Sequence, residues 1–255
     1  MYDTLLAGIP EDIIVTDYAV GVHWTFVRAG TLTGTAITVK ARSRRGSYRG
    51  PIIGEPLARV AALVKSWDFI EASIGAAAVN AYYNSIEKVK EQGGLAGIDL
   101  DDTSKANRIR KSAFPFYADE IQGRKVLTVG HFPDIEARLA PICQLTILER
   151  NPEPGDYPDS ACEYLMEEQD YAFITGMTVI NKTLPRLLAL AKGHARTILV
   201  GPSAPMTRSL HVYGVSAVSG FCVTDPELLA NVIRRGKMMD IFDAGYMTHI
   251  LYEGQ

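Results

Sequence analysis

One histidine and two aspartates fall in loops that follow predicted strands. His131 comes directly after an apolar strand, and Asp156 and Asp159 come after the next one. An imidazole changes its charge near neutral pH, so His131 is the candidate for a general acid or base, or for a metal ligand. The aspartates would assist it in catalysis or supply oxygen ligands. A hydrogen-bonded structural histidine, with aspartates that serve turns and a helix start, is the alternative interpretation.

Three glycines stand where predicted parallel strands turn into helices: Gly130, Gly176 and Gly201. Glycine at such a turn lets a ligand approach the backbone and leaves helix N–H groups free for an anion. One such glycine is explained by its turn, but three at one sheet edge favour a ligand site. The same loops supply the other candidate ligand-binding residues, which are Phe132, Arg150, Thr175, Asn181, Thr183, Pro202 and Ser203.

A carboxylate, Glu149, lies 19 residues after Gly130. Dinucleotide-binding folds hold a ribose hydroxyl with a carboxylate at about this spacing. The G-x-G-x-x-G pattern is absent, so NAD binding is weakly supported, whereas a nucleoside-type ligand of the methyltransferase-like Rossmann kind stays open. Pairing with Arg150 or a surface lysine would explain Glu149 equally well. A nucleoside-type ligand and a divalent metal are the cofactor classes that remain.

The elements that position these residues change character near the middle of the chain. Runs rich in β-branched and aromatic residues at 13–19, 22–27 and 35–41 predict an antiparallel meander, and helices are expected at 57–64 and 69–82. From 125 onward apolar strands alternate with helices, which predicts a parallel sheet covered on both faces. The glycine-rich, charged segment 92–113 is interpreted as a linker, which gives domains 1–110 and 111–255.

Three local patterns refine this prediction. The run from Gly75 to Ala78 has almost no side-chain bulk, so another backbone could approach the second helix closely. Ser160 and Glu163 match a capping box, and Asp225 before Pro226 predicts the N-cap of the last helix.

Composition excludes several classes of protein. Hydrophobic residues make up 47% of the 255 and charged residues 22%, as in ordinary globular proteins, and the net charge of −3 predicts no nucleic-acid partner. Three cysteines without C-x-x-C spacing argue against a disulfide framework and favour a cytoplasmic setting. The start lacks a signal-peptide pattern and no apolar run reaches about 18 residues, so no membrane association is expected. The expected partner is a small-molecule ligand, and a homodimer is compatible with the sequence.

A short basic run extends from Lys40 through Arg42, Arg44 and Arg45 to Arg49, with Tyr48 among these cations. It could bind phosphate or RNA. In an otherwise acidic chain, a solvated loop is the simpler interpretation.

Taken together, these residues resemble the putative heavy-metal chelation family, which pairs an enolase N-terminal-like domain with a Rossmann-like domain. The resemblance covers nearly the whole chain. It rests on the segments 73–81, 129–133, 149–152, 155–159, 174–176 and 201–203. It implies an α/β fold with an enolase-N-like α+β domain followed by a Rossmann-like parallel-sheet domain. It also implies a site in the cleft between the domains, to which Asn80 would contribute.

The resemblance further implies an enzyme that acts on or makes a small heterocyclic or metal-chelating molecule, by condensation or hydrolysis in the synthesis of a flavin-, pterin- or siderophore-like chelator. A non-catalytic binding protein for a metal or metal chelate is one alternative, and an S-adenosylmethionine-dependent methyltransferase-like enzyme is another. The sequence holds no cluster of soft ligands, which argues against direct tight metal capture by the protein. Whether the protein is an enzyme stays open at this point.

Overall fold

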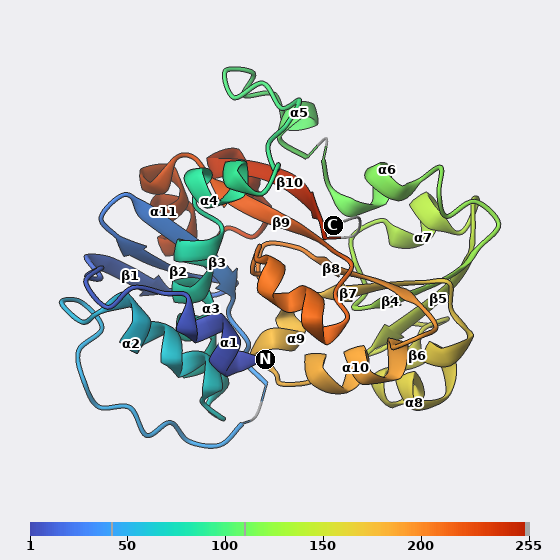
Figure 1. Cartoon of the computed structure of the whole chain (residues 1–255), viewed down its shortest axis with the longest axis horizontal. Coiled ribbons are helices and arrows are strands. Elements are labelled where there is room, and N and C mark those ends of the chain that lie inside the picture. Colours follow the sequence, from blue (N-terminus) through green and yellow to red (C-terminus); the bar gives the residue numbers. More distant parts are fainter. Residues whose placement is uncertain (42, 110, 253–255) are drawn as a thin grey trace.

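The computed structural model describes residues 1–41, 43–109 and 111–252, which form two sheets with helices packed on both. Figure 1 shows the smaller sheet at one end of the molecule and the β4–β5 end of the larger sheet at the other. This arrangement confirms the predicted fold class, an α+β unit with an antiparallel meander followed by a Rossmann-like unit.

The smaller sheet is the predicted meander. Its strands are β1 (Asp17–Val20), β2 (Trp24–Ala29) and β3 (Leu32–Ile37). They pair antiparallel in chain order, and Ala29 lies opposite Leu32. Gly30 has a φ of +61°, which suits the tight turn between these two residues. Because the chain reverses there, the third strand begins at Leu32, earlier than predicted.

The helix α3 covers one face of this sheet. The helices of the first part of the chain are α1 (Tyr2–Ala7), α2 (Leu57–Ala61), η1 (Ala62–Lys65), α3 (Phe69–Tyr83) and α4 (Ile86–Glu91). A Cβ added at Gly75 would lie 2.7 Å from Val64 Cα and would collide with the Val64 nitrogen. One added at Gly34 on β3 would collide with the Ala81 nitrogen of α3. The predicted close approach of backbones at the small-residue run is therefore confirmed.

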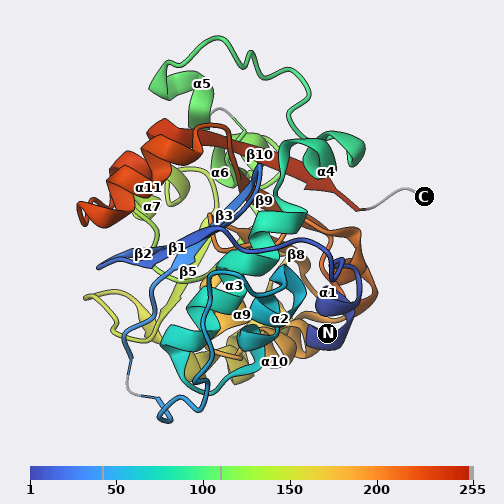
Figure 2. The same ribbon diagram turned by 90° about the vertical axis from the view of Figure 1, so that its left-hand side faces the viewer.

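The opposite face of the smaller sheet is covered by α11 (Pro226–Arg234), from the other end of the chain (Figure 2). Trp24 and Phe26 of β2 share an apolar cluster with Leu229 and Ile233 of α11. Val27, the next residue along β2, belongs instead to the cluster that includes α3. Side chains alternate between the two faces of a strand, so β2 is buried between two helices.

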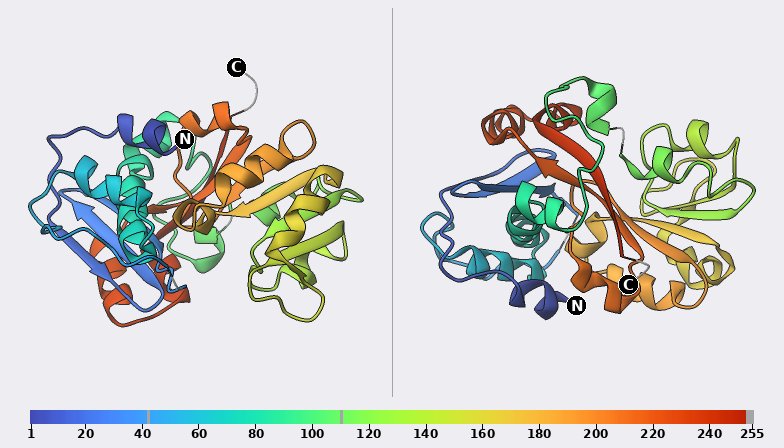
Figure 3. Two further views of the ribbon diagram at one scale, coloured as in Figure 1. Left: turned by 90° about the horizontal axis from the view of Figure 1, so that it is seen from below. Right: turned by 45° about the horizontal axis from the view of Figure 1, so that its top comes forward.

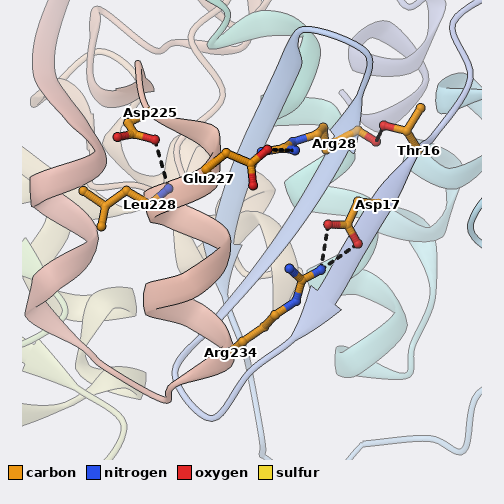
Figure 4. Close-up of polar contacts among 7 residues, drawn as sticks. All are labelled: Thr16, Asp17, Arg28, Asp225, Glu227, Leu228 and Arg234. Carbon is orange, nitrogen blue, oxygen red and sulfur yellow. Dashed lines mark hydrogen bonds and ion pairs between the residues drawn. The ribbon is translucent and has the colours of Figure 1, made fainter.

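Polar contacts orient α11 on the sheet (Figure 4). Asp225 accepts a hydrogen bond from the Leu228 N–H at 2.9 Å, which confirms the predicted N-cap. Further along, Arg234 Nη2 lies 2.6 Å from Asp17 Oδ2 of β1. A second ion pair, at 2.6 Å, joins Arg28 Nη1 of β2 to Glu227 Oε1 of α11.

The larger sheet has seven strands in the order β10-β9-β8-β7-β4-β5-β6. Its strands are β4 (Lys125–Val129), β5 (Gln144–Glu149), β6 (Tyr157–Pro158), β7 (Tyr171–Thr175), β8 (Arg196–Val200), β9 (Ala217–Val223) and β10 (Gly245–Leu251). All neighbours are parallel except β10, which runs antiparallel to β9. Neither β10 nor α4 was predicted from the sequence.

Helices cover both faces of this sheet, as predicted (Figure 3). Leu139 packs in one cluster with Val126 and Phe173, whereas Leu187 belongs to the cluster that holds Leu127 and Ile174. The helices are α5 (Lys105–Ile109), α6 (Ala113–Tyr117), α7 (Ile135–Leu139), α8 (Cys162–Leu165), α9 (Met177–Ile180) and α10 (Leu184–Ala191). The short 3₁₀ segments are η2 (Asp159–Ala161), η3 (Met166–Glu168), η4 (Arg208–Tyr213) and η5 (Met239–Ala244).

Two local expectations fail. The capping box is wrong, because Ser160 lies inside η2 with no side-chain cap and Glu163 instead accepts from Arg186 Nε at 2.9 Å. The helix expected over 179–191 is broken into α9 and α10, since Lys182 between them has a φ of +70°.

One apolar cluster contains residues from both parts of the chain, among them Val27 and Leu148. The division into domains 1–110 and 111–255 stays a prediction, and residue 110 lies outside the described residues. Within the described part of the chain, the cysteines Cys143, Cys162 and Cys222 are free. No described helix has the length and apolar character that a membrane span requires.

We expect the substitution Gly75→Ala to destabilise the fold. In an open helix this change would stabilise by about 1 kcal/mol, because alanine favours the helix. Here the new methyl group must displace the Val64 backbone, and we expect a loss of about 2 kcal/mol in the free energy of unfolding, measured in urea. Gly193→Ala, at a φ of +82° with open space around it, is the control for backbone strain without a clash, and we expect it to cost about 1 kcal/mol. A stabilised Gly75→Ala variant would contradict the close packing.

We also expect apolar packing, rather than the ion pairs, to hold α11 in place. Asp17→Asn should lower the free energy of unfolding by at most about 1 kcal/mol, because the pair is exposed to solvent. Leu229→Ala removes a fully buried side chain and should cost about 2–5 kcal/mol in the same denaturation experiment. The reverse ranking would show that the salt bridges dominate.

Candidate functional site

The chain order of the larger sheet reverses at β4. From β4 the chain moves to β5 and β6 on one side, and later strands add on the other side through β7, β8 and β9. Open parallel sheets bind ligands outside the carboxyl ends of the strands at such a switch point. Residues that follow β4 and β7 are therefore the best placed, and sequence patterns alone could not locate this reversal.

The three glycines lie at this carboxyl edge. Their N–H groups extend the parallel ladder, from Gly130 to Leu148 O at 2.8 Å, from Gly176 to Val200 O at 2.8 Å and from Gly201 to Ser219 O at 2.9 Å. Since β8, β7 and β4 are neighbours, the glycine turns share one edge, as the sequence suggested. Their ligand-binding roles stay predictions.

The three glycines are required for two different structural reasons. Gly130 and Gly201 have φ values of +108° and +101°, a backbone region that other residues rarely adopt. Gly176 is helical, but a Cβ there would lie 2.6 Å from the Ser203 carbonyl carbon. Gly176 therefore lets the loop after β8 lie directly against the turn after β7.

His131 pairs with Asp156 across two loops. The distance from His131 Nδ1 to Asp156 Oδ2 is 3.0 Å, and the Asp156 side chain is 1% exposed, against 21% for the histidine. Asp156 is itself held, because its Oδ2 accepts from the Glu153 N–H at 3.0 Å. A buried, fixed carboxylate on Nδ1 selects the tautomer and directs Nε2 away from the pair. The structure thus joins two of the three predicted catalytic residues.

The carboxylate also sets the protonation of the imidazole. The hydrogen bond to Asp156 and the charge of that group raise the pKa of His131 above its ordinary value, and burial opposes them only partly. His249 on β10 is different, because burial lowers its pKa to about 4. Of these two histidines, only His131 is placed to exchange protons at the sheet edge.

The third predicted catalytic residue, Asp159, does not contact His131. Its Oδ2 accepts from Arg150 Nε at 2.9 Å, and both side chains are 43% exposed. Arg150 was predicted to bind ligand, and in the structure its side chain is engaged by this ion pair. Its ligand-binding role stays a prediction.

Glu149 links the loops after β4 and β5. Its Oε2 accepts from the His131 N–H at 3.0 Å, and its Oε1 accepts from the N–H groups of Arg150 at 2.7 Å and Asn151 at 3.3 Å. A carboxylate has about four acceptor positions, so three are already used. Glu149, which was predicted to hold a ribose hydroxyl, therefore fixes the backbone of His131.

Polar side chains join the first part of the chain to the loop after β8. Asn80 of α3 donates from Nδ2 to Thr35 O at 2.9 Å and to Pro202 O at 3.2 Å. Its Oδ1 is buried and has no hydrogen-bond partner among the described residues. Ser203 Oγ accepts from the Ile37 N–H of β3 at 2.8 Å. Asn80, Pro202 and Ser203 are thus brought together, as part of the contact between the two parts.

Asn84, the C-cap residue of α3, was missed from the sequence. Its Nδ2 donates to Ala204 O at 3.0 Å and Phe221 O at 3.2 Å, and its Oδ1 accepts from the Met206 N–H at 2.8 Å. A buried amide that meets three backbone groups fixes the loop in one position. An asparagine at a helix end gives no sequence signal that distinguishes this role from an ordinary C-cap.

The remaining predicted ligand residues have local partners. Thr175 Oγ1 accepts from the Met177 N–H at 3.3 Å, and Asn181 Oδ1 accepts from Thr183 Oγ1 at 2.7 Å in the break between α9 and α10. Phe132 packs edge-on against Phe114, with ring centroids 5.2 Å apart.

The described side chains do not fit a metal held by protein ligands alone, because no three His, Cys, Asp or Glu residues among them are grouped as ligands. Of the predicted metal ligands, His131 and Asp156 are hydrogen-bonded to each other, and Asp159 is paired with Arg150. The arrangement can instead transfer a proton through an oriented imidazole.

Comparisons with known proteins agree with this architecture. Two family models, both described as putative heavy-metal chelation, match residues 2–83 and 112–252. One similar crystal structure is that of a protein of unknown function from Desulfitobacterium hafniense, a member of the family matched at 112–252. It is 38% identical in sequence and has a TM-score of 0.86, and the match covers 98% of this chain and 97% of that protein.

Two archaeal proteins are more distant. A Pyrococcus horikoshii protein of the same family and of unknown function is 20% identical, with a TM-score of 0.75 over 98% of this chain and 96% of its own, and shows the fold alone. An uncharacterised protein of Methanocaldococcus jannaschii is 26% identical over 87% of this chain and 83% of its own. The matches at both ends of the chain and the 38% identical structure lead to one conclusion: the chain belongs to the putative heavy-metal chelation family.

Proposed function

We propose that this protein is an acid–base enzyme that acts on a small heterocyclic or metal-chelating molecule at the carboxyl edge of its larger sheet. The observation that carries the proposal is the His131–Asp156 pair, which stands at the strand order reversal with its carboxylate almost completely buried. An oriented imidazole of raised pKa can give a proton to a leaving group or take one from an attacking water or amine. Condensation and hydrolysis of a chelator precursor both need such a group.

Supporting residues would hold the reactant rather than react. The Gly130 and Gly201 turns leave backbone close to the edge without side chains in the way. Glu149 would keep the His131 backbone fixed through its 3.0 Å hydrogen bond. In this proposal Asp156 is a positioning residue, because it acts through the imidazole.

A second candidate is a non-catalytic protein that binds a metal chelate. The observation that favours it is the same pair, since histidines that ligate metals commonly donate their other ring nitrogen to a carboxylate. The protein would then supply one ligand, and the chelator would supply the others.

Analysis of what co-purifies with the native protein separates the two candidates. We expect a small organic molecule in the mass spectrum, and we expect His131→Gln to retain a different compound, the unreacted substrate, because the variant keeps the shape of the site without its proton transfer. His194→Gln, which changes an exposed histidine outside the site, is the control. Stoichiometric metal with an identical chelate in both variants would contradict the enzyme and support the binding protein.

The proton-transfer role also predicts a pH dependence. Asp156→Asn should lower the pKa of His131 toward its ordinary value, measured by NMR titration of the imidazole. Because the pKa is raised in the folded state, the pair stabilises the fold below the unfolded pKa of about 6.5, and this contribution is lost as pH rises through the raised pKa. Asp159→Asn, whose carboxylate meets Arg150, should leave the pKa of His131 unchanged. An unchanged pKa in Asp156→Asn would rule out the pairing.

A further inference from the structure

A groove of about 680 Å³ lies beside the loop that follows β3, and its described lining residues all come from positions 44–71. Five cationic side chains line it, namely Arg44, Arg45, Arg49, Arg59 and Lys65. The whole chain has a net charge of −3, so positive charge is concentrated here. A concave surface with one dominant sign of charge attracts ligands of the opposite sign.

The two carboxylates that line this groove bind backbone, whereas two of its five cations, Arg59 and Lys65, form ion pairs with Glu55 and Asp3 outside its lining. Asp68 accepts from the Gly46 N–H at 2.8 Å, and Glu71 accepts from the Tyr48 N–H at 2.8 Å. Both acids therefore hold the backbone of the basic loop. In the described part of the chain, no ion pair involves the loop arginines Arg44, Arg45 and Arg49.

The basic loop follows the start of α3 closely. The Arg44 N–H donates to Trp67 O at 3.1 Å, which places the first arginine of the groove next to the tryptophan backbone. Gly46 permits this path, because a Cβ there would collide with the Glu71 carboxylate. The three arginines thus lie on a loop that hydrogen bonds fix, and Arg49 Nη1 also donates to Tyr48 O at 2.8 Å. Arg42 of the predicted basic run lies outside the described residues.

An exposed aromatic ring completes the groove. Trp67 lines it and is 59% exposed, whereas the other tryptophan of the chain, Trp24, is 7% exposed. A tryptophan face stacks on flat aromatic groups, and guanidinium groups bind phosphate oxygens in pairs. We infer that the groove binds a nucleotide, with its phosphates on Arg44, Arg45 and Arg49 and its base on Trp67. This site is separate from the acid–base pair and does not depend on its function.

Calorimetric titration of the full chain with ATP, inorganic tripolyphosphate and adenosine, in EDTA, tests both halves of this site. ATP should bind at least about tenfold more tightly than either fragment, because it alone makes both contacts. Raising the KCl concentration should weaken ATP binding, since salt screens the phosphate contacts. Binding should also quench the fluorescence of Trp67.

Variants distinguish the site from general charge attraction. Replacing Arg44, Arg45 and Arg49 together by alanine should weaken ATP binding by at least about tenfold. The matched control replaces the exposed cations Arg124, Lys192 and Lys237 by alanine and should leave it unchanged. Trp67→Ala should weaken ATP but not tripolyphosphate. These substitutions are all at exposed positions, and thermal melting checks that the fold is kept.

Several results would overturn the inference. If tripolyphosphate binds as tightly as ATP, the base does not contribute to binding and does not stack on Trp67. If the control triple variant loses as much ATP affinity as the arginine variant, the attraction is nonspecific. Binding of a short single-stranded RNA without binding of ATP would assign the groove to a nucleic acid instead of a mononucleotide.

Discussion

Two buried amides at the C-terminal end of α3 join the two parts of this molecule. Asn80 of α3 and its C-cap residue Asn84 reach across to the backbone at Pro202, Ala204 and Met206, and their side chains are almost completely buried. A buried amide without its partners costs about 1–3 kcal/mol, so the loop has one favourable position. The small side chains on the same helix let η1 and β3 pack closely against it.

This contact positions the loop after β8 at the carboxyl edge of the larger sheet. With the loop after β8 fixed, the Ser203 backbone lies directly against Gly176, which leaves no room for a side chain at that turn. The turns after β4, β7 and β8 then form a continuous edge. On the β4 side, Glu149 and Asp156 hold the backbone and the ring of His131. The His131–Asp156 pair and the contact between the two parts therefore lie on one edge of the larger sheet.

Much of the fold could be predicted from the sequence, because the spacing of hydrophobic residues and the positions of turn residues depend on local structure. The parallel strands and the α11 cap at Asp225 came directly from such patterns. The break at Lys182 and the strand β10 did not, since a positive φ on lysine and pairing to a distant strand depend on tertiary contacts. For the site, the sequence marked His131 and Asp156 but could not join them, and it could not show that Asp159 pairs with Arg150 and not with His131.

Hydrogen–deuterium exchange in Asn84→Leu tests most directly whether α3 fixes the loop that completes the edge. Leucine has the branched shape of asparagine, though it is larger, and it leaves Ala204 O and the Met206 N–H without partners. We expect amides from 201 to 206 to exchange much faster in this variant, while those of β4 keep their protection. Unchanged exchange at Met206 would contradict the central role of this contact.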